Sequence, residues 1–286
     1  MDDRELLKLV TRIVGAENTQ DDCAVLPCGG RFMVATTDML HRTTDFVDGM
    51  SDWQIGWMSA AVTISDIASM GADPAYLLIA VGLDDWHHLE GVMKGAEACC
   101  KKFGAHIVGG DIDRHGELTV VTTGLGLVDA DRIVRRIGAK SGDQVCITGI
   151  PGQAQAYLDG YQQFQQKLFE PQPRVAEAKA IGKAGATAMM DDSDGIALSL
   201  FDLAAVNEVG FALESRLLPV PRGIPVEQAG ELALYGGGDY ELIFTLPQGS
   251  VVPGIEYTVI GRVTAEKNIV IDGKPLEKRG YQHRWD

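Results

Sequence analysis

Hydrophobic and polar positions in the first half of the chain follow two spacings. Apolar side chains three and four residues apart are typical of amphipathic helices, and short apolar or alternating runs are typical of strands. The polar, Gly-rich residues 15–30 are predicted to be a loop. The predicted helices are residues 3–14, 53–70 and 87–103, and the predicted strands are residues 31–40, 75–83, 106–111 and 118–128. Helices and strands mixed in this order fit an α/β or α+β domain.

The second half begins after a break in this pattern. Gly, Ser and Lys punctuate the segment GAKSGDQ at residues 138–144, as they do in loops. Beyond it, helices are predicted at residues 153–169, 174–182 and 197–209, and strands at residues 145–152, 242–246 and 257–263. The second half therefore reads as an α/β unit of its own. We expect two domains, residues 1–137 and residues 138–286, which suits a chain of 286 residues.

Composition indicates a globular protein of the cytoplasm. Hydrophobic residues make up 45% of the chain, enough for a large core, and no apolar run approaches the roughly 20 residues that span a bilayer. The acidic start MDDRELLKLV does not resemble a signal peptide. The five cysteines are odd in number and match no zinc spacing, so neither a disulfide nor a zinc site is expected.

The net charge of −15, from 40 acidic and 25 basic residues, argues against binding to nucleic acid. Phosphate neutralisation by a basic patch supplies much of the affinity of nucleic-acid binders. A surplus of acids can simply keep a surface solvated, and it can also gather around divalent cations. Only the positions of the acids along the chain separate these two interpretations.

Five polar clusters stand out by position, and four of them are predicted to lie at a strand end or in a glycine turn. Strand ends are where α/β proteins gather ligand sites. Carboxylate and hydroxyl oxygens are the ligands that Mg²⁺ prefers, and the bound ion can bridge the phosphates of a nucleotide. The clusters are Asp21-Asp22, Thr36-Thr37-Asp38, Ser65-Asp66, Gly109-Gly110-Asp111 and Asp191-Asp192-Ser193-Asp194-Gly195.

Taken singly, most of these clusters have a plain structural explanation. An Asp beside Gly is usually a turn residue, and an Asp before a helix is usually an N-cap. Asp66 is different because it lies in the apolar helical stretch AAVTISDIASMGA, where a carboxylate is costly unless it is paired or bound to a cation. The glycines at 109–110 and 236–238 fit either close approach to phosphate or ordinary turns. The adjacent residues Arg135 and Arg136 could bind a phosphate through paired hydrogen bonds, but from the residues alone we expect them to be solvated.

Several segments together resemble one enzyme family in order and spacing. They are DDCAVL at 21–26, TTDML at 36–40, TISDIASMGADP at 63–74, VGGD at 108–111, RRIGAKSGD at 135–143, VCITGIPG at 145–152, DDSDG at 191–195, GGGDYEL at 236–242 and GYQH at 280–283. The set resembles thiamine-monophosphate kinase, of the superfamily that includes aminoimidazole ribonucleotide synthetase. The resemblance implies direct, Mg²⁺-assisted phosphoryl transfer from ATP to thiamine monophosphate. It also implies a homodimer whose N-terminal sheets pair into a barrel with ATP near the interface, and a C-terminal α/β sandwich.

The resemblance also assigns roles to residues. Asp66, Asp191 and Asp194 would act in catalysis. ATP would contact Gly110, Asp111, Arg136 and Ser193, and thiamine monophosphate would contact Asp45 and Tyr281. The magnesium ligands would be Asp22, Thr36, Thr37, Asp38, Asp66, Asp111, Asp191 and Asp194.

One departure from the family leaves alternatives open. Most relatives carry Glu, a substrate contact, where this chain has Gly238, and Asp239 or Glu241 is a candidate to replace it. A related ATP-dependent enzyme with another acceptor, or a nucleotide-binding dimer without turnover, is therefore also considered.

Overall fold

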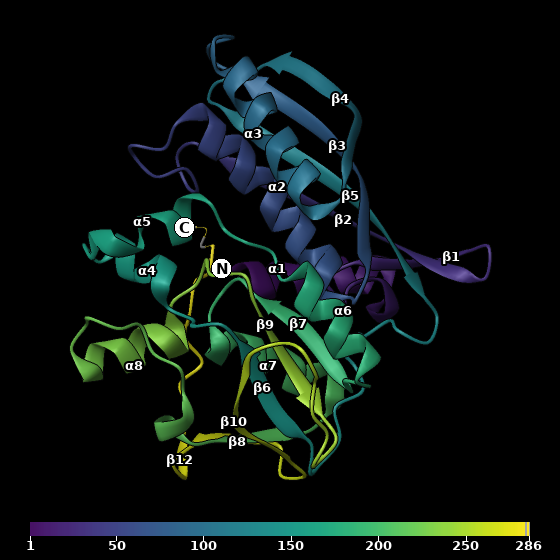
Figure 1. Cartoon of the computed structure of the whole chain (residues 1–286), viewed down its shortest axis with the longest axis vertical. Coiled ribbons are helices and arrows are strands. Elements are labelled where there is room, and N and C mark those ends of the chain that lie inside the picture. The colour runs from purple at the N-terminus through teal and green to yellow at the C-terminus, as the bar shows by residue number, and fades with distance from the viewer. Residues whose placement is uncertain (284, 286) are drawn as a thin grey trace.

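Two β-sheets organise the chain in the computed structural model, which describes residues 1–283 and residue 285 (Figure 1). The first sheet has the strand order β1-β2-β5-β3-β4, and the second has the order β12-β11-β8-β10-β6-β9-β7. None of the helices in the described part of the chain is both long and apolar enough to cross a membrane. The predicted mixed α/β class is confirmed.

The first sheet is built from the first half of the chain. β2 and β5 pair antiparallel along their whole length, and β3 pairs parallel with the edge strand β4. The strands are β1 (Ala24–Cys28), β2 (Arg31–His41), β3 (Asp73–Leu83), β4 (His106–Arg114) and β5 (Thr119–Asp129), and the helices are α1 (Asp3–Val14), η1 (Ala16–Asn18), α2 (Asp52–Ser69) and α3 (His88–Phe103).

Helices α2 and α3 cover one face of this sheet. Ser51 and Gln54 form a capping box that starts α2, and the helix is then buried over most of its length because it is apolar nearly all round. A Cβ on Gly56 would lie 1.8 Å from the carbonyl oxygen of Val92, so glycine is required where the two helices cross. This close packing fixes α2, and with it Asp66, above the sheet.

No layer of the described part of the chain covers the other face of the same sheet. Residues of β3 alternate, so that Leu77 and Ile79 are buried beneath the helices while Tyr76 and Leu78 point to the opposite side. Tyr76 is 46% exposed, Leu78 41% and Met39 of β2 59%. We refer to this side as the open face.

The second sheet and its helices come from the second half of the chain. Its core is formed by inward side chains of the central strands and α7, among them Ile147, Leu200 and Phe211. The strands are β6 (Gln144–Thr148), β7 (Ala188–Asp192), β8 (Gly210–Leu213), β9 (Glu241–Leu246), β10 (Tyr257–Thr264), β11 (Ile269–Ile271) and β12 (Lys274–Pro275). The helices are α4 (Gln153–Leu158), η2 (Gln162–Phe164), α5 (Gln165–Phe169), α6 (Val175–Lys183), α7 (Ile196–Asn207), η3 (Ser215–Leu217) and α8 (Val226–Tyr235).

Helix α2 also packs against the second half. Its residue Ala68 belongs to a buried cluster with Cys146 of β6 and Ala178 of α6. The indole nitrogen of Trp57 donates to the carbonyl oxygen of Pro171 at 2.9 Å. Helix α2 therefore contacts the second half through both its N-terminal part, at Trp57, and its C-terminal part, at Ala68.

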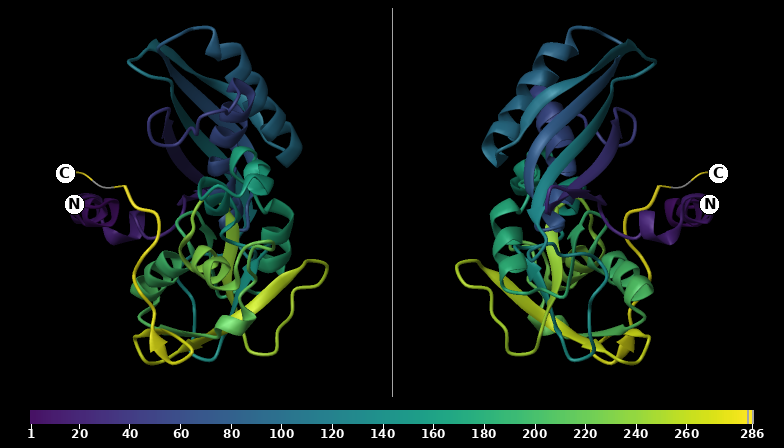
Figure 2. Two further views of the ribbon diagram at one scale, coloured as in Figure 1. Left: turned by 90° about the vertical axis from the view of Figure 1, so that its left-hand side faces the viewer. Right: turned by 90° about the vertical axis from the view of Figure 1, so that its right-hand side faces the viewer.

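The two chain ends lie side by side, away from both cores (Figure 2). Met1 and Trp285 exchange hydrogen bonds, with the nitrogen of each bonded to the carbonyl oxygen of the other, and the amide of Asp3 donates to the carbonyl oxygen of His283. Helix α1 buries none of its side chains.

Several predicted elements need correction. Thr36, Thr37 and Asp38 lie inside β2 rather than at its end, because they pair with Gly124, Thr123 and Thr122, respectively, in the middle of β5. The segment 109–111 is not a turn, since it continues as strand β4. The single helix predicted at 153–169 is broken at Gly160, which has a left-handed φ of +100°. Strands β1, β7, β8, β11 and β12 and helix α8 were not predicted.

Candidate functional site

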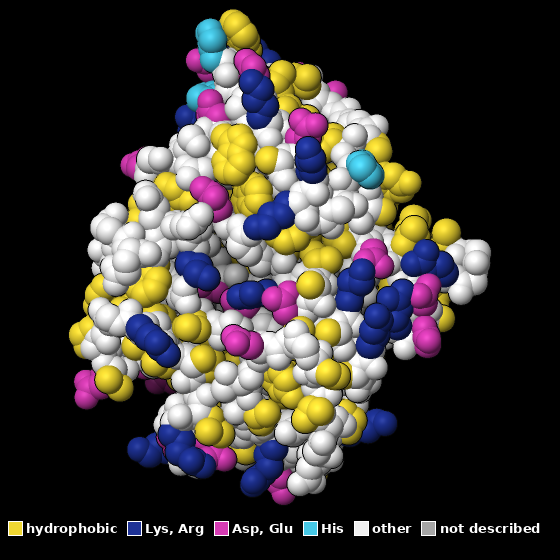
Figure 3. Space-filling model, in the orientation of Figure 1, with side chains coloured by type: hydrophobic (Ala, Val, Ile, Leu, Met, Phe, Trp, Pro, Cys, Tyr) yellow, Lys and Arg dark blue, Asp and Glu magenta, His cyan; other side chains and the backbone are white. Residues whose placement is uncertain are grey.

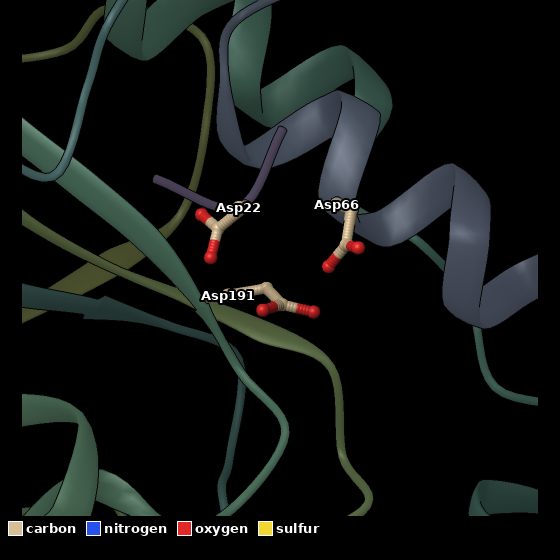
Figure 4. Close-up of side chains that lie close together, drawn as sticks. All are labelled: Asp22, Asp66 and Asp191. Atoms are coloured by element: carbon tan, nitrogen blue, oxygen red, sulfur yellow. The ribbon is translucent and has the colours of Figure 1, made fainter. Parts of the chain in front are cut away.

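Three carboxylates from distant parts of the chain converge where the two halves meet. Asp22 comes from the loop before β1, Asp66 from α2 and Asp191 from β7. One carboxylate oxygen from each lies within 4.8 Å of the other two, and Figure 4 shows the three groups facing a common space. We call these residues the carboxylate cluster.

Hydroxyl groups hold each member of the cluster in place. Thr36 donates to Asp66 at 2.6 Å, Ser65 to Asp191 at 2.7 Å, and Ser69 to Asp22 at 2.5 Å. Sequence reasoning assigned no role to either serine, although Ser65 belongs to one of the five polar clusters. A signal was available, because Ser69 is three residues after Asp66 and four after Ser65, and residues at these spacings lie together on one side of a helix.

A fourth carboxylate, Asp38, extends the cluster. Asp38 and Thr36 are two residues apart in β2, so both point to the side of the sheet that α2 covers. The hydroxyl of Thr63 in α2 donates to Asp38 at 2.6 Å. The charge of Asp38 contributes to the raised pKa of Asp66, which places the two groups in one electrostatic site.

The cluster has the electrostatics of a cation site. Burial, and then the charges of Asp38, Asp191 and Asp22, raise the pKa of Asp66 well above its ordinary value. Burial and the charge of Asp22 raise the pKa of Asp191 to about 8. Buried like charges are unfavourable unless a cation compensates them. Because all the donors are oxygens, the residues fit Mg²⁺ rather than a softer metal.

Two arginines flank the cluster and are not free in solvent, so the expectation from the residues alone is wrong. Arg136 donates to Asp22 through Nε at 2.8 Å and also through Nη2, and Arg135 donates to Asp21 through Nε at 2.6 Å. The charge of Asp22 is one cause of the raised pKa of Arg136. A buried guanidinium beside several carboxylates is placed to meet anionic groups that a cation brings there.

Asp194 and its loop lie next to the cluster and are held by both ends of the chain. Arg4 of α1 contacts the carboxylate of Asp194 at 2.9 Å, and the amide of Tyr281 donates to its carbonyl oxygen at 3.0 Å. The carbonyl oxygen of Ser193 accepts the amide of Gly238 at 2.8 Å. These backbone hydrogen bonds place Tyr281 beside Asp194, and they place Gly238 beside the preceding residue, Ser193.

Asp45 lies in the turn after β2. Its carboxylate accepts the amide of His41 at 2.8 Å and the hydroxyl of Thr44 at 2.6 Å. After burial, the charges of Asp45 and Asp194 are the next causes of the raised pKa of Tyr281. These three residues therefore share one region of the molecule.

Thr37, Gly110 and Asp111 are not brought to the carboxylate cluster within one chain. Thr37 points away from the helices and contacts the hydroxyl of Thr123 at 3.0 Å. Asp111 lies in the exposed edge strand β4, where it pairs with Ala80 of the neighbouring strand β3. Gly110 has a packing role, because a Cβ there would lie 1.7 Å from the carbonyl oxygen of Ile79.

The two acids that follow Gly238, Asp239 and Glu241, both accept hydrogen bonds from nearby groups of the same chain. Asp239 accepts the amides of Gly152, Gln153 and Ala154 at 2.6–3.0 Å, and so caps α4. Glu241 is bound by Arg174 and by the hydroxyl of Thr148 at 2.6 Å. Both carboxylates are therefore occupied by local partners, which argues against the suggestion that Asp239 or Glu241 stands in for the Glu expected at 238.

Tyr240 is a further residue that sequence reasoning did not assign. Its phenol has a raised pKa because of burial and then the charges of Asp191, Asp38, Asp194 and Asp45. Its φ of +53° is rare for a residue with a side chain, and such strain often accompanies functional sites. The phenol of Tyr240 thus feels the charges of both the metal side and the Asp45 side of the site.

Comparisons with known proteins show which family the chain belongs to. A family model described as AIR synthase related protein, N-terminal domain, matches residues 20–128. The chain is 49% identical to a thiamine-monophosphate kinase from Methanospirillum hungatei over 288 residues, which cover all of both chains. It is 37% identical to a thiamine-monophosphate kinase from Archaeoglobus fulgidus, with 99% of this chain and 98% of the relative covered.

A solved structure, described as AaThiL complexed with AMPPCP and TMP, superimposes with a TM-score of 0.91 at 27% identity. The match covers 99% of this chain and 97% of that one. The two-sheet fold is therefore that of the AIR synthase related proteins, as expected. Taken with the identity to curated relatives over the full length, this likeness shows that the chain belongs to the thiamine-monophosphate kinase family.

Proposed function

We propose that this protein transfers the terminal phosphoryl group of ATP to thiamine monophosphate, which gives thiamine diphosphate and ADP. The observation that carries the proposal is the carboxylate cluster, found in a chain 49% identical to a thiamine-monophosphate kinase over its full length. The similar structure named for its complex with AMPPCP and TMP supports the choice of substrates.

The metal that this function requires is Mg²⁺, and we propose several ions. Asp22, Asp38, Asp66 and Asp191, with the hydroxyl of Thr36, supply hard oxygen ligands in one buried place, and Asp194 lies beside them. Bound Mg²⁺ would neutralise the charge that develops on the phosphoryl oxygens. Without a cation, the raised pKa of Asp66 means that this carboxyl resists ionisation.

The chain's own part in the reaction is positioning and charge stabilisation. Asp66, Asp191 and Asp194 are the proposed catalytic acids because they would fix the geometry in which the two substrates meet in line. Arg136, Ser193, Gly110 and Asp111 are proposed to contact ATP. The acceptor oxygen of thiamine monophosphate is already anionic, so no strong general base is needed.

The proposed thiamine side is the region of Asp45 and Tyr281. Thiamine carries a positively charged ring, which a carboxylate and an aromatic face both favour. The chemistry of these two side chains therefore suits the part of the substrate that does not react. Gly238 contributes no side chain there, which makes this side of the site the one where the chain departs from its family.

We propose a homodimer in which the open faces of two N-terminal sheets pair into a barrel. The open face carries exposed Met39 on β2 and exposed Tyr76 and Leu78 on β3, and exposed apolar patches mark interfaces. Thr37 and Asp111 lie on this same face, so a second copy would cover them. The dimer would thus let Asp111 of one protomer approach the metal side of its partner, which a single chain does not achieve.

The division into domains is also a proposal. The connector from Ala130 to Asp143 joins the two sheets, and the boundary proposed at residues 137 and 138 falls within it.

The five cysteines are all free, which suits the reducing environment of the cytoplasm, our proposed location. Acidic and basic side chains are interspersed over the face seen in Figure 3, which suits small-molecule substrates rather than nucleic acid.

The proposal is tested by ADP release with purified protein, ATP, Mg²⁺ and thiamine monophosphate. Turnover that depends on both Mg²⁺ and thiamine monophosphate is expected. Other phosphorylated acceptors serve as the comparison, because Gly238 leaves open an enzyme with a different acceptor. Folded protein that binds ATP but turns over none of the acceptors would instead indicate a nucleotide-binding dimer without activity.

A further inference from the structure

Arg4 of helix α1 bridges two acids of the second half. Its Nη2 lies 2.9 Å from Oδ2 of Asp194 and 2.8 Å from Oδ2 of Asp202, and its Nε lies 3.2 Å from both oxygens of Asp202. The Arg4 side chain is only 16% exposed. Asp202 belongs to α7, and Asp194 lies in the loop that precedes this helix. The guanidinium therefore reaches from the first residues of the chain to the edge of the proposed metal site.

Core packing does not explain this contact. Helix α1 buries none of its side chains, and Leu9, Val10 and Ile13 remain 46–76% exposed. The hydrogen bonds between Met1 and Trp285 and between Asp3 and His283 tie α1 to the other chain end. Arg4 is thus a polar contact, aimed at an acid of the site, on a helix that contributes little to either core.

Asp202 and Asp194 bind the guanidinium of Arg4 in different ways. Asp202 binds the guanidinium edge with both oxygens, which fixes the plane of Arg4. The remaining contact then reaches one oxygen of Asp194, whose side chain is 27% exposed and so is not fully enclosed by protein. Partners of this kind, which orient a metal-binding side chain without touching the metal, commonly control metal affinity.

We propose that Arg4 is a positioning residue that holds the Asp194 carboxylate in the orientation needed to bind Mg²⁺. The proposal rests on the metal role of Asp194 in the proposed function. If so, helix α1 contributes to metal binding through Arg4. Arg4 itself touches neither metal nor substrate.

The test is Mg²⁺ titration of full-length wild type, Arg4→Ala, Arg4→Lys and the matched control Arg12→Ala. Arg12 lies on the same helix, and among the described residues its side chain donates only to the backbone oxygen of Lys8. Calorimetry in the presence of AMPPCP measures Mg²⁺ binding without turnover, and kinetics measure kcat and the Mg²⁺ concentration for half-maximal rate. Arg4→Ala is expected to weaken Mg²⁺ binding about tenfold or more, as is usual for loss of an orienting partner. Arg4→Lys should recover part of this loss, and Arg12→Ala should match wild type.

Folded Arg4→Ala with wild-type Mg²⁺ affinity would overturn the proposal, even if its melting temperature were lower, since it would show that Arg4 only anchors α1. Should Arg4→Ala not fold, Asp202→Asn decides, because it releases Arg4 while leaving Asp194 intact. A smaller loss of Mg²⁺ affinity is expected there, and wild-type affinity would contradict the proposal. Failure of the proposed function is distinguishable: the wild type would not turn over thiamine monophosphate, while calorimetry would still report the effect of Arg4 on Mg²⁺.

Discussion

Ser65 donates a hydrogen bond of 2.7 Å to Asp191, and this contact joins the two halves of the molecule at the carboxylate cluster. Ser65 lies in α2 of the first half, and Asp191 lies 126 residues further along the chain in β7. Both side chains are buried. The site therefore exists only when both halves are folded and packed together.

Ser65→Ala should weaken both stability and metal binding. The substitution leaves a buried carboxylate without its donor, which costs about 1–3 kcal/mol. Urea unfolding and Mg²⁺ titration measure the two effects. Ser59→Ala is the matched control, since Ser59 is buried in the same helix but donates to the backbone oxygen of Ile55. Equal Mg²⁺ affinities for the two variants would show that Ser65 does not orient Asp191.

Asp66→Asn should abolish Mg²⁺-dependent turnover while leaving the protein folded. It removes a proposed metal ligand, and it also removes one of several buried acidic groups, so the metal-free variant should melt at a higher temperature than metal-free wild type near pH 8. Thermal unfolding in EDTA and the ADP-release assay measure these opposite effects. Asp84→Asn, at an exposed acid, should change neither property. Activity near the wild-type level in Asp66→Asn would refute the role of Asp66.

The stability of the metal-free protein should fall as pH rises. The pKa of Asp191 is raised from 3.8 to about 8 by burial and by the charge of Asp22, and that of Asp66 is raised as well. Between these values the folded chain binds more protons than the unfolded chain, so the free energy of unfolding decreases with pH across this window. Melting temperatures in EDTA from about pH 5 to about pH 8.5 should show the decline. Mg²⁺ binds the ionised carboxylates, so it should flatten the slope; a flat profile in EDTA would contradict the proposed electrostatics.

Restoring the family carboxylate at position 238 should not be neutral. Gly238 has a φ of +90°, and a Cβ there would lie 3.2 Å from that of Ala154. Gly238→Glu and Gly238→Ala should therefore each lose about 1–2 kcal/mol of unfolding free energy, the cost of a left-handed conformation for an L-residue. Chemical denaturation of wild type and of both variants measures this loss of unfolding free energy. If Gly238→Glu is as stable as wild type, the local backbone is not what excludes a side chain.

The sequence predicts most of the first half because its elements are long and strongly periodic. It predicts α2 and the importance of Asp66, since a carboxylate within an apolar helix needs compensation. It does not predict β7, because this strand has five residues, two of them Asp, and is stabilised by pairing with β9 some 50 residues away.

The composition of the site is likewise only partly predictable. Resemblance brings Asp22, Asp66 and Asp191 together, and the structure places them so. The supporting donors Ser65, Ser69 and Arg4 depend on tertiary packing, since only the folded chain sets α2 against β7 and α1 against α7. Thr37 and Asp111 lie on the open face of the same sheet, so their proposed metal role depends on a second copy of the chain.

The central claim is that Asp22, Asp66 and Asp191 hold a divalent cation together. A crystal grown with AMPPCP and Mn²⁺ in place of Mg²⁺ tests it directly, because Mn²⁺ gives an anomalous signal. We expect an anomalous peak among the three carboxylates, about 2–2.3 Å from their oxygens, as is usual for oxygen ligands of small divalent cations. A map with nucleotide bound but no anomalous peak between these residues would contradict the account.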